Sequence, residues 1–171
     1  DRHAMGEASV VSALTLDTSL NVTPFSQTVL NPRTRTSFSP RIDYQLSPNH
    51  TLVTRYSYSG SSVENGGIGE LSLPSRGYNS DNTEHSLQVT ETAVLGSRAV
   101  NETRFQFRRS GSDQSALSAL PTINVLGAFT GGGAGVGNSY THEDSYELQN
   151  STSMTHGTHT LKVGGRLRGS S

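Results

Sequence analysis

The sequence predicts an all-β fold, an antiparallel meander of long hairpins. The first support is the alternation of apolar and polar residues with a period of two, the pattern of strands with one apolar face. The second is the spacing of turns, because short clusters of turn-forming residues alternate with long stretches rich in Gly, Ser and Asn. The composition agrees, since only 31% of the residues are hydrophobic, too few for a two-sided core.

The first predicted hairpin covers residues 35–60. Its first strand places apolar residues at even positions and polar residues, including Arg41 and Asp43, at odd positions. Ser47-Pro-Asn-His50 is a cluster of turn-forming residues, after which the alternation resumes with Arg55 on the polar face. These residues therefore predict two paired strands joined by a short turn.

The second predicted hairpin covers residues 84–110, with Gly96-Ser-Arg98 as its turn. The returning strand alternates two Phe residues with polar ones. Its charged positions on the polar face are Glu102, Arg104 and Arg108. Glu91 and Arg109 interrupt the apolar face of this hairpin.

The third predicted hairpin covers residues 140–168 and contains His156-Gly-Thr-His159. One interpretation of the two His residues is a metal site. The favoured interpretation is a two-residue turn with Gly157 and Thr158 at its centre, because strand alternation surrounds it and Gly adopts a positive φ without strain. Charged residues on the polar face of this hairpin are Glu143, Glu147, Lys162, Arg166 and Arg168.

The predicted strands are about 10 to 14 residues long, so they exceed the usual soluble length and match the 9 to 11 or so tilted residues that cross a bilayer. The predicted connections between hairpins, 61–83 and 111–139, are long, whereas the turns within hairpins are short. This asymmetry is typical of outer-membrane β-barrels, which have long external loops and short periplasmic turns. We therefore expect about six strands of a transmembrane barrel, with both long connections outside the cell.

In such a barrel the apolar face contacts lipid and the polar face lines the lumen, because an Arg or Lys facing lipid near the midplane costs about 2 to 4 kcal/mol. The predicted lumen-facing residues are Arg41, Asp43, Arg55, Glu102, Arg104, Arg108, Glu143, Glu147, Lys162, Arg166 and Arg168. An alternative is a soluble or surface-attached all-β binding module or adhesin, because its sheet would show the same alternation with the polar face in water.

The sequence contains little that indicates other chemistry. The 13 basic and 14 acidic residues nearly balance, which does not favour nucleic-acid binding. Cysteine is absent, and no Gly-x-Ser-x-Gly motif is present. The Gly-rich segment 130–137 lacks the Lys-Ser/Thr ending of a nucleotide loop, so we expect a flexible loop there. We predict no catalytic activity, no metal site and no cofactor.

Several segments, taken in order, resemble the barrel region of TonB-dependent outer-membrane receptors of the Oar-like type. They include "LPSRGYNSDNTEHSLQVTETAVL" and "NETRFQFRRS", together with residues 25–58 and 120–169. The similarity covers residues 25–169. Each motif alone is weak, but their order and spacing are fairly specific.

The resemblance implies a barrel of about 22 strands in the outer membrane of a Gram-negative bacterium. It also implies a plug domain inside the barrel, contact with TonB through an N-terminal region, and uptake of a scarce substrate. We expect residues 1–171 to be part of such a barrel without its plug, because about six strands are too few to close one. The expected partners are outer-membrane lipid, the plug and remaining barrel, and TonB.

Overall fold

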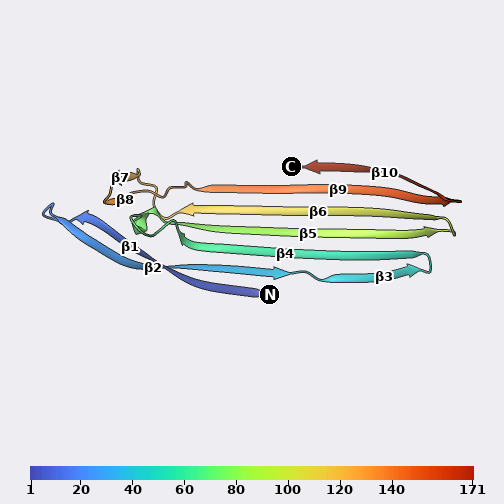
Figure 1. The fold of residues 1–171 in the computed structure, drawn as a ribbon, viewed down its shortest axis with the longest axis horizontal. Coiled ribbons are helices and arrows are strands. Elements are labelled where there is room, and N and C mark those ends of the chain that lie inside the picture. The colour runs from blue at the N-terminus through green and yellow to red at the C-terminus, as the bar shows by residue number, and fades with distance from the viewer. The chain divides into compact units, whose positions relative to one another are not determined.

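The computed structural model describes residues 1–171, most of which lie in β-strands (Figure 1). The eight strands of the large sheet are β1 (Arg2–Leu16), β2 (Val22–Phe38), β3 (Arg41–Ser47), β4 (His50–Gly66), β5 (Tyr78–Leu95), β6 (Ala99–Ala116), β9 (Ser139–His156) and β10 (His159–Ser170). A two-stranded sheet contains β7 (Ile123–Val125) and β8 (Phe129–Gly131). The single helix is a short 3-10 turn, η1 (Pro74–Arg76), and no helix is long and apolar enough to span a membrane.

The strand order of the large sheet is β1-β2-β4-β5-β6-β9-β10, and β3 also pairs with β4. The registers of β1 with β2, β3 with β4, and β9 with β10 are antiparallel. Strands β2 and β3 are separated by Ser39 and Pro40, and Pro40 has no N–H to donate to a strand ladder. The predicted all-β, antiparallel meander is therefore confirmed.

The chain forms two compact units, and the long strands pass from one to the other. The first unit contains residues 1–36, 60–83 and 111–141, and the second contains residues 37–59, 84–110 and 142–171. The long connections between hairpins belong to the first unit, whereas the short turns of β3–β4, β5–β6 and β9–β10 belong to the second.

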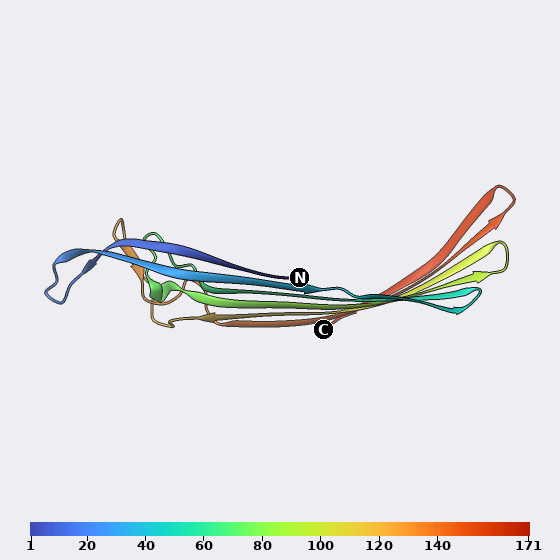
Figure 2. The same cartoon turned by 90° about the horizontal axis from the view of Figure 1, so that it is seen from below.

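The first unit has a small apolar core built on one face of β1. Val11 is fully buried, and Ala13 and Ile68 are nearly so. Partly buried side chains pack around them, namely Phe25, Val29, Leu73 and Phe129. The β4–β5 connection also bonds to the backbone of β1, because Glu70 N donates to Val10 O at 2.9 Å. Strand β8 contacts β1, and Figure 2 shows the segment of β7 and β8 at the same end of the sheet as the β1–β2 turn.

The second unit contains the short turns. His156 pairs with His159 across the β9–β10 turn, and Gly157 has φ +60°. Thr158 has no positive φ, so the turn has the type II′ hairpin geometry, in which the first central residue alone has a positive φ that Gly adopts without a side-chain clash. The prediction that Gly157 and Thr158 form the centre of a turn is confirmed.

The predicted connections 61–83 and 111–139 are longer than the actual ones. Strand β4 continues to Gly66 and β5 begins at Tyr78, while β6 continues to Ala116 and β9 begins at Ser139. The added strand residues are rich in Ser, Gly, Asn and Asp on both faces, so they show no alternation of polarity. The prediction of three hairpins also missed β1 and most of β2.

The Gly-rich segment 130–137 is packed against the chain. Thr130 and Gly131 belong to β8. A Cβ atom at Gly132 would lie 2.0 Å from Pro121 O, and one at Gly133 would lie 1.9 Å from Leu120 O. Backbone approaches this close are open only to Gly, so these glycines permit packing of the connection on itself.

Candidate functional site

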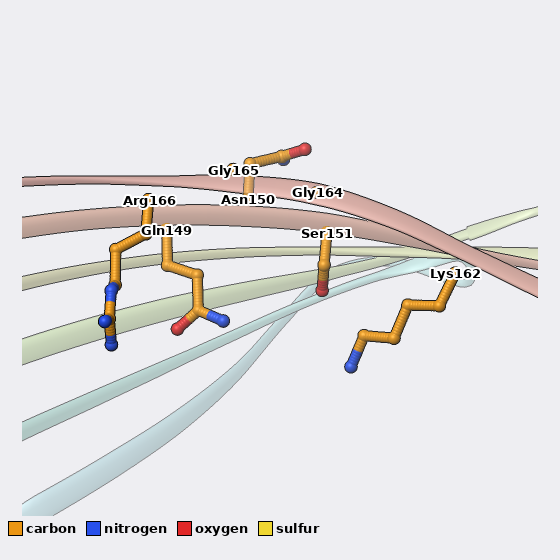
Figure 3. Close-up of a pocket in the computed structure, with 7 residues that line it drawn as sticks. All are labelled: Gln149, Asn150, Ser151, Lys162, Gly164, Gly165 and Arg166. Atoms are coloured by element: carbon orange, nitrogen blue, oxygen red, sulfur yellow. The ribbon is translucent and has the colours of Figure 1, made fainter.

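The charged side chains of β9 and β10 share one face. Glu147 pairs directly with Arg168, and Ser153 pairs with Lys162, so residues at odd positions of β9 and even positions of β10 project to the same side. Figure 3 shows Gln149, Ser151, Lys162 and Arg166 on this side and Asn150 on the other. Alternation along both strands produces this separation.

Glu147 is the centre of an ion-pair cluster on that face. Arg168 donates to Glu147 Oε2 from Nε at 3.0 Å and from Nη2 at 2.9 Å. Arg166 Nη1 lies 3.9 Å from Glu147 Oε1. The Glu147 side chain is 25% exposed, so one half-buried carboxylate compensates two guanidinium groups.

Strands β5 and β6 contribute further pairs. Arg108 Nη2 donates to Glu84 Oε2 at 2.6 Å, and Arg104 Nη2 donates to Glu102 Oε1 at 3.1 Å. Buried Nε of Arg104 has no hydrogen-bond partner. Glu84 was not among the predicted residues, although its even position on β5 matches the polar Ser86 and Gln88 and would have identified it.

Strands β3 and β4 carry the remaining charged residues that were predicted to face the lumen. Arg41 lies directly opposite Arg55 in the strand register. Like charges at this position repel, and the Arg41 guanidinium is bonded to Asp43 on its own strand, at 2.8 Å from Nη2 to Oδ1. Arg55 has no ion pair.

We use the term charged face for the eleven predicted residues together with Glu84. A shallow hollow joins its β6, β9 and β10 parts, because Arg108, Glu147 and Arg168 line it together. Nine of these twelve residues form ion pairs with one another, and three do not. The three are Arg55, Glu143 and Lys162. Whether this face lines a lumen remains a prediction.

The opposite face carries apolar and aromatic side chains. Tyr56 and Tyr58 lie beside His85, and the Phe107 and Tyr146 rings are 5.1 Å apart. Solvent-exposed apolar residues of this face include Ile42, Leu148, Leu161, Val163 and Leu167. A face so apolar and so little covered is the kind that a lipid bilayer buries.

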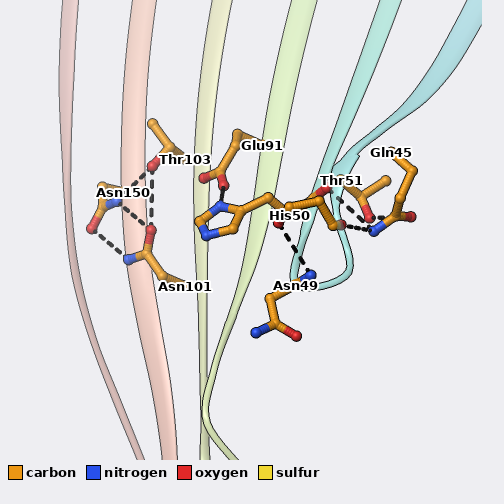
Figure 4. Close-up of polar contacts among 9 residues, drawn as sticks. Gln45, Asn49, His50, Thr51, Glu91, Asn101, Thr103 and Asn150 are labelled. Atoms are coloured by element: carbon orange, nitrogen blue, oxygen red, sulfur yellow. Dashed lines mark hydrogen bonds and ion pairs between the residues drawn. The ribbon is translucent and has the colours of Figure 1, made fainter.

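Polar groups on the apolar face are bonded to one another. Glu91 Oε1 lies 2.7 Å from His50 Nδ1 (Figure 4), and Arg109 binds both oxygens of Asp144 at 2.8 Å. Asn101 Nδ2 donates to Asn150 Oδ1 at 3.2 Å. The two charged residues that interrupt the apolar pattern in the sequence, Glu91 and Arg109, are thus each bonded to a side chain on the neighbouring strand.

His156 and His159 are both exposed at the β9–β10 turn. Across the chain, no three His, Asp or Glu side chains are grouped as metal ligands would be. The turn places the two His residues directly opposite each other at the ends of β9 and β10.

Long antiparallel strands with one apolar and one charged face define a class of protein, the membrane-spanning β-sheet protein. The comparison with protein families agrees. The family model described as an outer membrane beta barrel domain matches residues 8–171, and the chain belongs to this family. No curated protein and no solved structure matches the chain. Family membership suggests a location in the outer membrane of a bacterium.

Proposed function

We propose that this chain is the barrel segment of a TonB-dependent transporter that takes up a scarce substrate across the outer membrane of a Gram-negative bacterium. The observation that carries the proposal is the separation of an apolar face from a charged face in the strand residues of the second unit, 37–59, 84–110 and 142–171. In this proposal the apolar side contacts lipid and the charged face lines the barrel lumen.

The sheet order supports a barrel larger than these strands. Strands β1 and β10 lie at opposite ends of the order, so each has one edge to pair with a further strand. Open edges do not persist in a bilayer, because unpaired backbone groups cost several kcal/mol each there. In the proposal, further strands of the same protein complete the barrel, a plug occupies its lumen, and TonB binds its N-terminal region. We assign the chain no catalytic step and no cofactor.

The first experiment tests the barrel. The full-length protein, expressed in a Gram-negative bacterium, is expected in the outer-membrane fraction, and its migration in gels is expected to change on heating as barrels unfold. Release into the soluble fraction would contradict the proposal and favour the binding-module alternative.

The second experiment tests the transport class. Full-length protein purified in detergent is expected to retain the periplasmic domain of TonB in a pull-down assay, and deletion of its N-terminal segment is expected to abolish retention. A heat-modifiable barrel that never retains TonB would keep the membrane assignment and overturn the TonB-dependent one.

A further inference from the structure

A second hollow on the charged face lies between β9 and β10. It is lined by Gln149, Asn150, Ser151, Lys162, Gly164, Gly165 and Arg166. Figure 3 shows Lys162 at one end of the hollow and Arg166 at the other, with Ser151 and Gln149 between them. Two cations therefore flank two neutral hydrogen-bonding groups.

Gly164 leaves the space open. It occupies the charged-face position between Lys162 and Arg166, where any other residue would project a side chain into the hollow. A Cβ atom at this position would also lie 2.5 Å from Asn150 O and 2.8 Å from Ser151 Cβ. The close approach of β9 and β10 therefore requires Gly, which keeps the space between the two cations unfilled.

The positive charge of the hollow is only partly compensated. Lys162 has no ion pair, and the one carboxylate near Arg166 is Glu147, at 3.9 Å. Arg168 already binds Glu147 at 2.9 Å. Gln149 and Ser151 supply an N–H and an O–H donor on the same side. Several donors and a net positive charge thus stand at the edges of the hollow, whose own lining is mostly apolar and includes no carboxylate.

We propose that this hollow binds a carboxylate group. A carboxylate accepts several hydrogen bonds at once and is attracted by both cations, which matches the groups present. Its source is either an acidic side chain of the same protein or a dissolved acid, and the experiment distinguishes them. The inference goes beyond the proposed function, and its test does not use transport.

The first measurement compares two thiol reagents of similar size and opposite charge on full-length Ser151→Cys protein in outer-membrane vesicles. We expect the anionic reagent to react about tenfold faster than the cationic one, because cations raise the local concentration of anions. The added double change Lys162→Gln and Arg166→Gln is expected to bring the ratio of rates close to one. Arg55→Gln is the matched control and leaves the ratio unchanged, because three strand spacings, about 14 Å, exceed the screening length at physiological salt.

The second measurement identifies the source of the carboxylate. Succinate is added during labelling of Ser151→Cys. If labelling slows in proportion to the succinate concentration, the carboxylate comes from a dissolved acid. A carbodiimide cross-link between Lys162 and an acidic residue of the same protein, located by mass spectrometry and absent in Lys162→Gln, indicates an internal one. The proposal would be overturned if the two reagents labelled Ser151→Cys at equal rates or not at all, and if succinate gave no protection and no cross-link formed.

Discussion

At the scale of single residues, Glu147 contributes more to the stability of the charged face than its neighbours, because two arginines share its carboxylate. Arg166 and Arg168 project from the same face of β10 toward this one carboxylate. Loss of either arginine leaves the carboxylate with a partner, whereas loss of the carboxylate leaves two cations that repel each other. The geometry therefore makes Glu147 and Arg168 unequal members of the same ion pair.

We predict that Glu147→Gln destabilises the full-length barrel by about 1 kcal/mol, because a partly exposed pair is worth that order of energy and the repulsion between Arg166 and Arg168 adds to it. Arg168→Gln is expected to cost less. The measurement is urea unfolding in lipid vesicles, followed by the heat-modifiable gel shift. Equal losses in the two variants would contradict the shared role of Glu147.

At the scale of the elements, the β6–β9 connection is held by contacts that only Gly allows. The Gly132 and Gly133 backbones pack on the carbonyl groups of Pro121 and Leu120. Arg76 of η1 joins this connection by donating to Thr122 Oγ1 at 2.6 Å and to the carbonyl of Gly133. The two long connections therefore form one packed structure.

We predict that Gly133→Ala loosens the β6–β9 connection, because its Cβ atom would lie 1.9 Å from Leu120 O and the backbone must move. Gly137→Ala is the matched control in the same connection, since no heavy atom lies within 4 Å of its Cβ position. Limited proteolysis of whole cells expressing the full-length protein measures the effect. Cleavage within residues 117–138 should be faster for Gly133→Ala alone, and equal rates in the two variants would count against the packing.

The β1–β2 turn depends on one carboxylate. Asp17 accepts hydrogen bonds from Asn21 N at 2.9 Å and from Ser19 N at 2.8 Å. The backbone N–H of Asn21 is the main cause of a pKa for Asp17 below its usual value of 3.8. Because folding lowers this pKa, the stabilisation is complete above the unfolded pKa and is lost as pH falls through the folded one.

We predict that Asp17→Ala reduces the protection of the Ser19 and Asn21 amide hydrogens at pH 7. In the unchanged protein the same loss should occur only as the pH falls below the usual carboxyl pKa of 3.8, because the pKa of Asp17 is lowered from that value. Hydrogen exchange, corrected for the intrinsic rate at each pH, measures both. Asp113→Ala removes an exposed carboxylate that has no ion pair, and it should leave these amides unchanged.

The strands that the sequence predicted are those whose two faces differ in polarity, as in residues 140–168. The sequence did not predict strand β1, because its two faces do not differ in polarity. Val10 and Val11 are adjacent, so they lie on opposite faces of β1, yet both are apolar. Val10 is on the exposed face, whereas Val11 is buried beneath the long connections. When distant segments cover one face of a strand, both faces can be apolar, and the alternation of apolar and polar residues is lost. A local sequence pattern then does not predict the strand. The pairing of Glu84 with Arg108 likewise depends on a register set by tertiary structure.

At the scale of the whole molecule, the alternation of the strands separates an apolar face from the charged face, and the proposed barrel places the first against lipid and the second in the lumen. Phe105 lies on the same side of β6 as Phe107, which contacts Tyr146 on the apolar face. Gln106 lines the hollow of the charged face that also contains Glu147. The same substitution at Phe105 and at Gln106, which are adjacent in β6, therefore compares the apolar face with the charged face.

We predict that Phe105→Arg lowers the amount of assembled full-length protein in the outer membrane, whereas Gln106→Arg does not. An Arg facing lipid near the midplane costs about 2 to 4 kcal/mol, a large part of the stability of a domain, whereas an Arg at position 106 lies near a carboxylate. Heat-modifiable protein in membrane fractions is the readout, with total expression as the reference. If Gln106→Arg were the defective variant, the two faces would be reversed, and the charged face would be the one turned toward lipid.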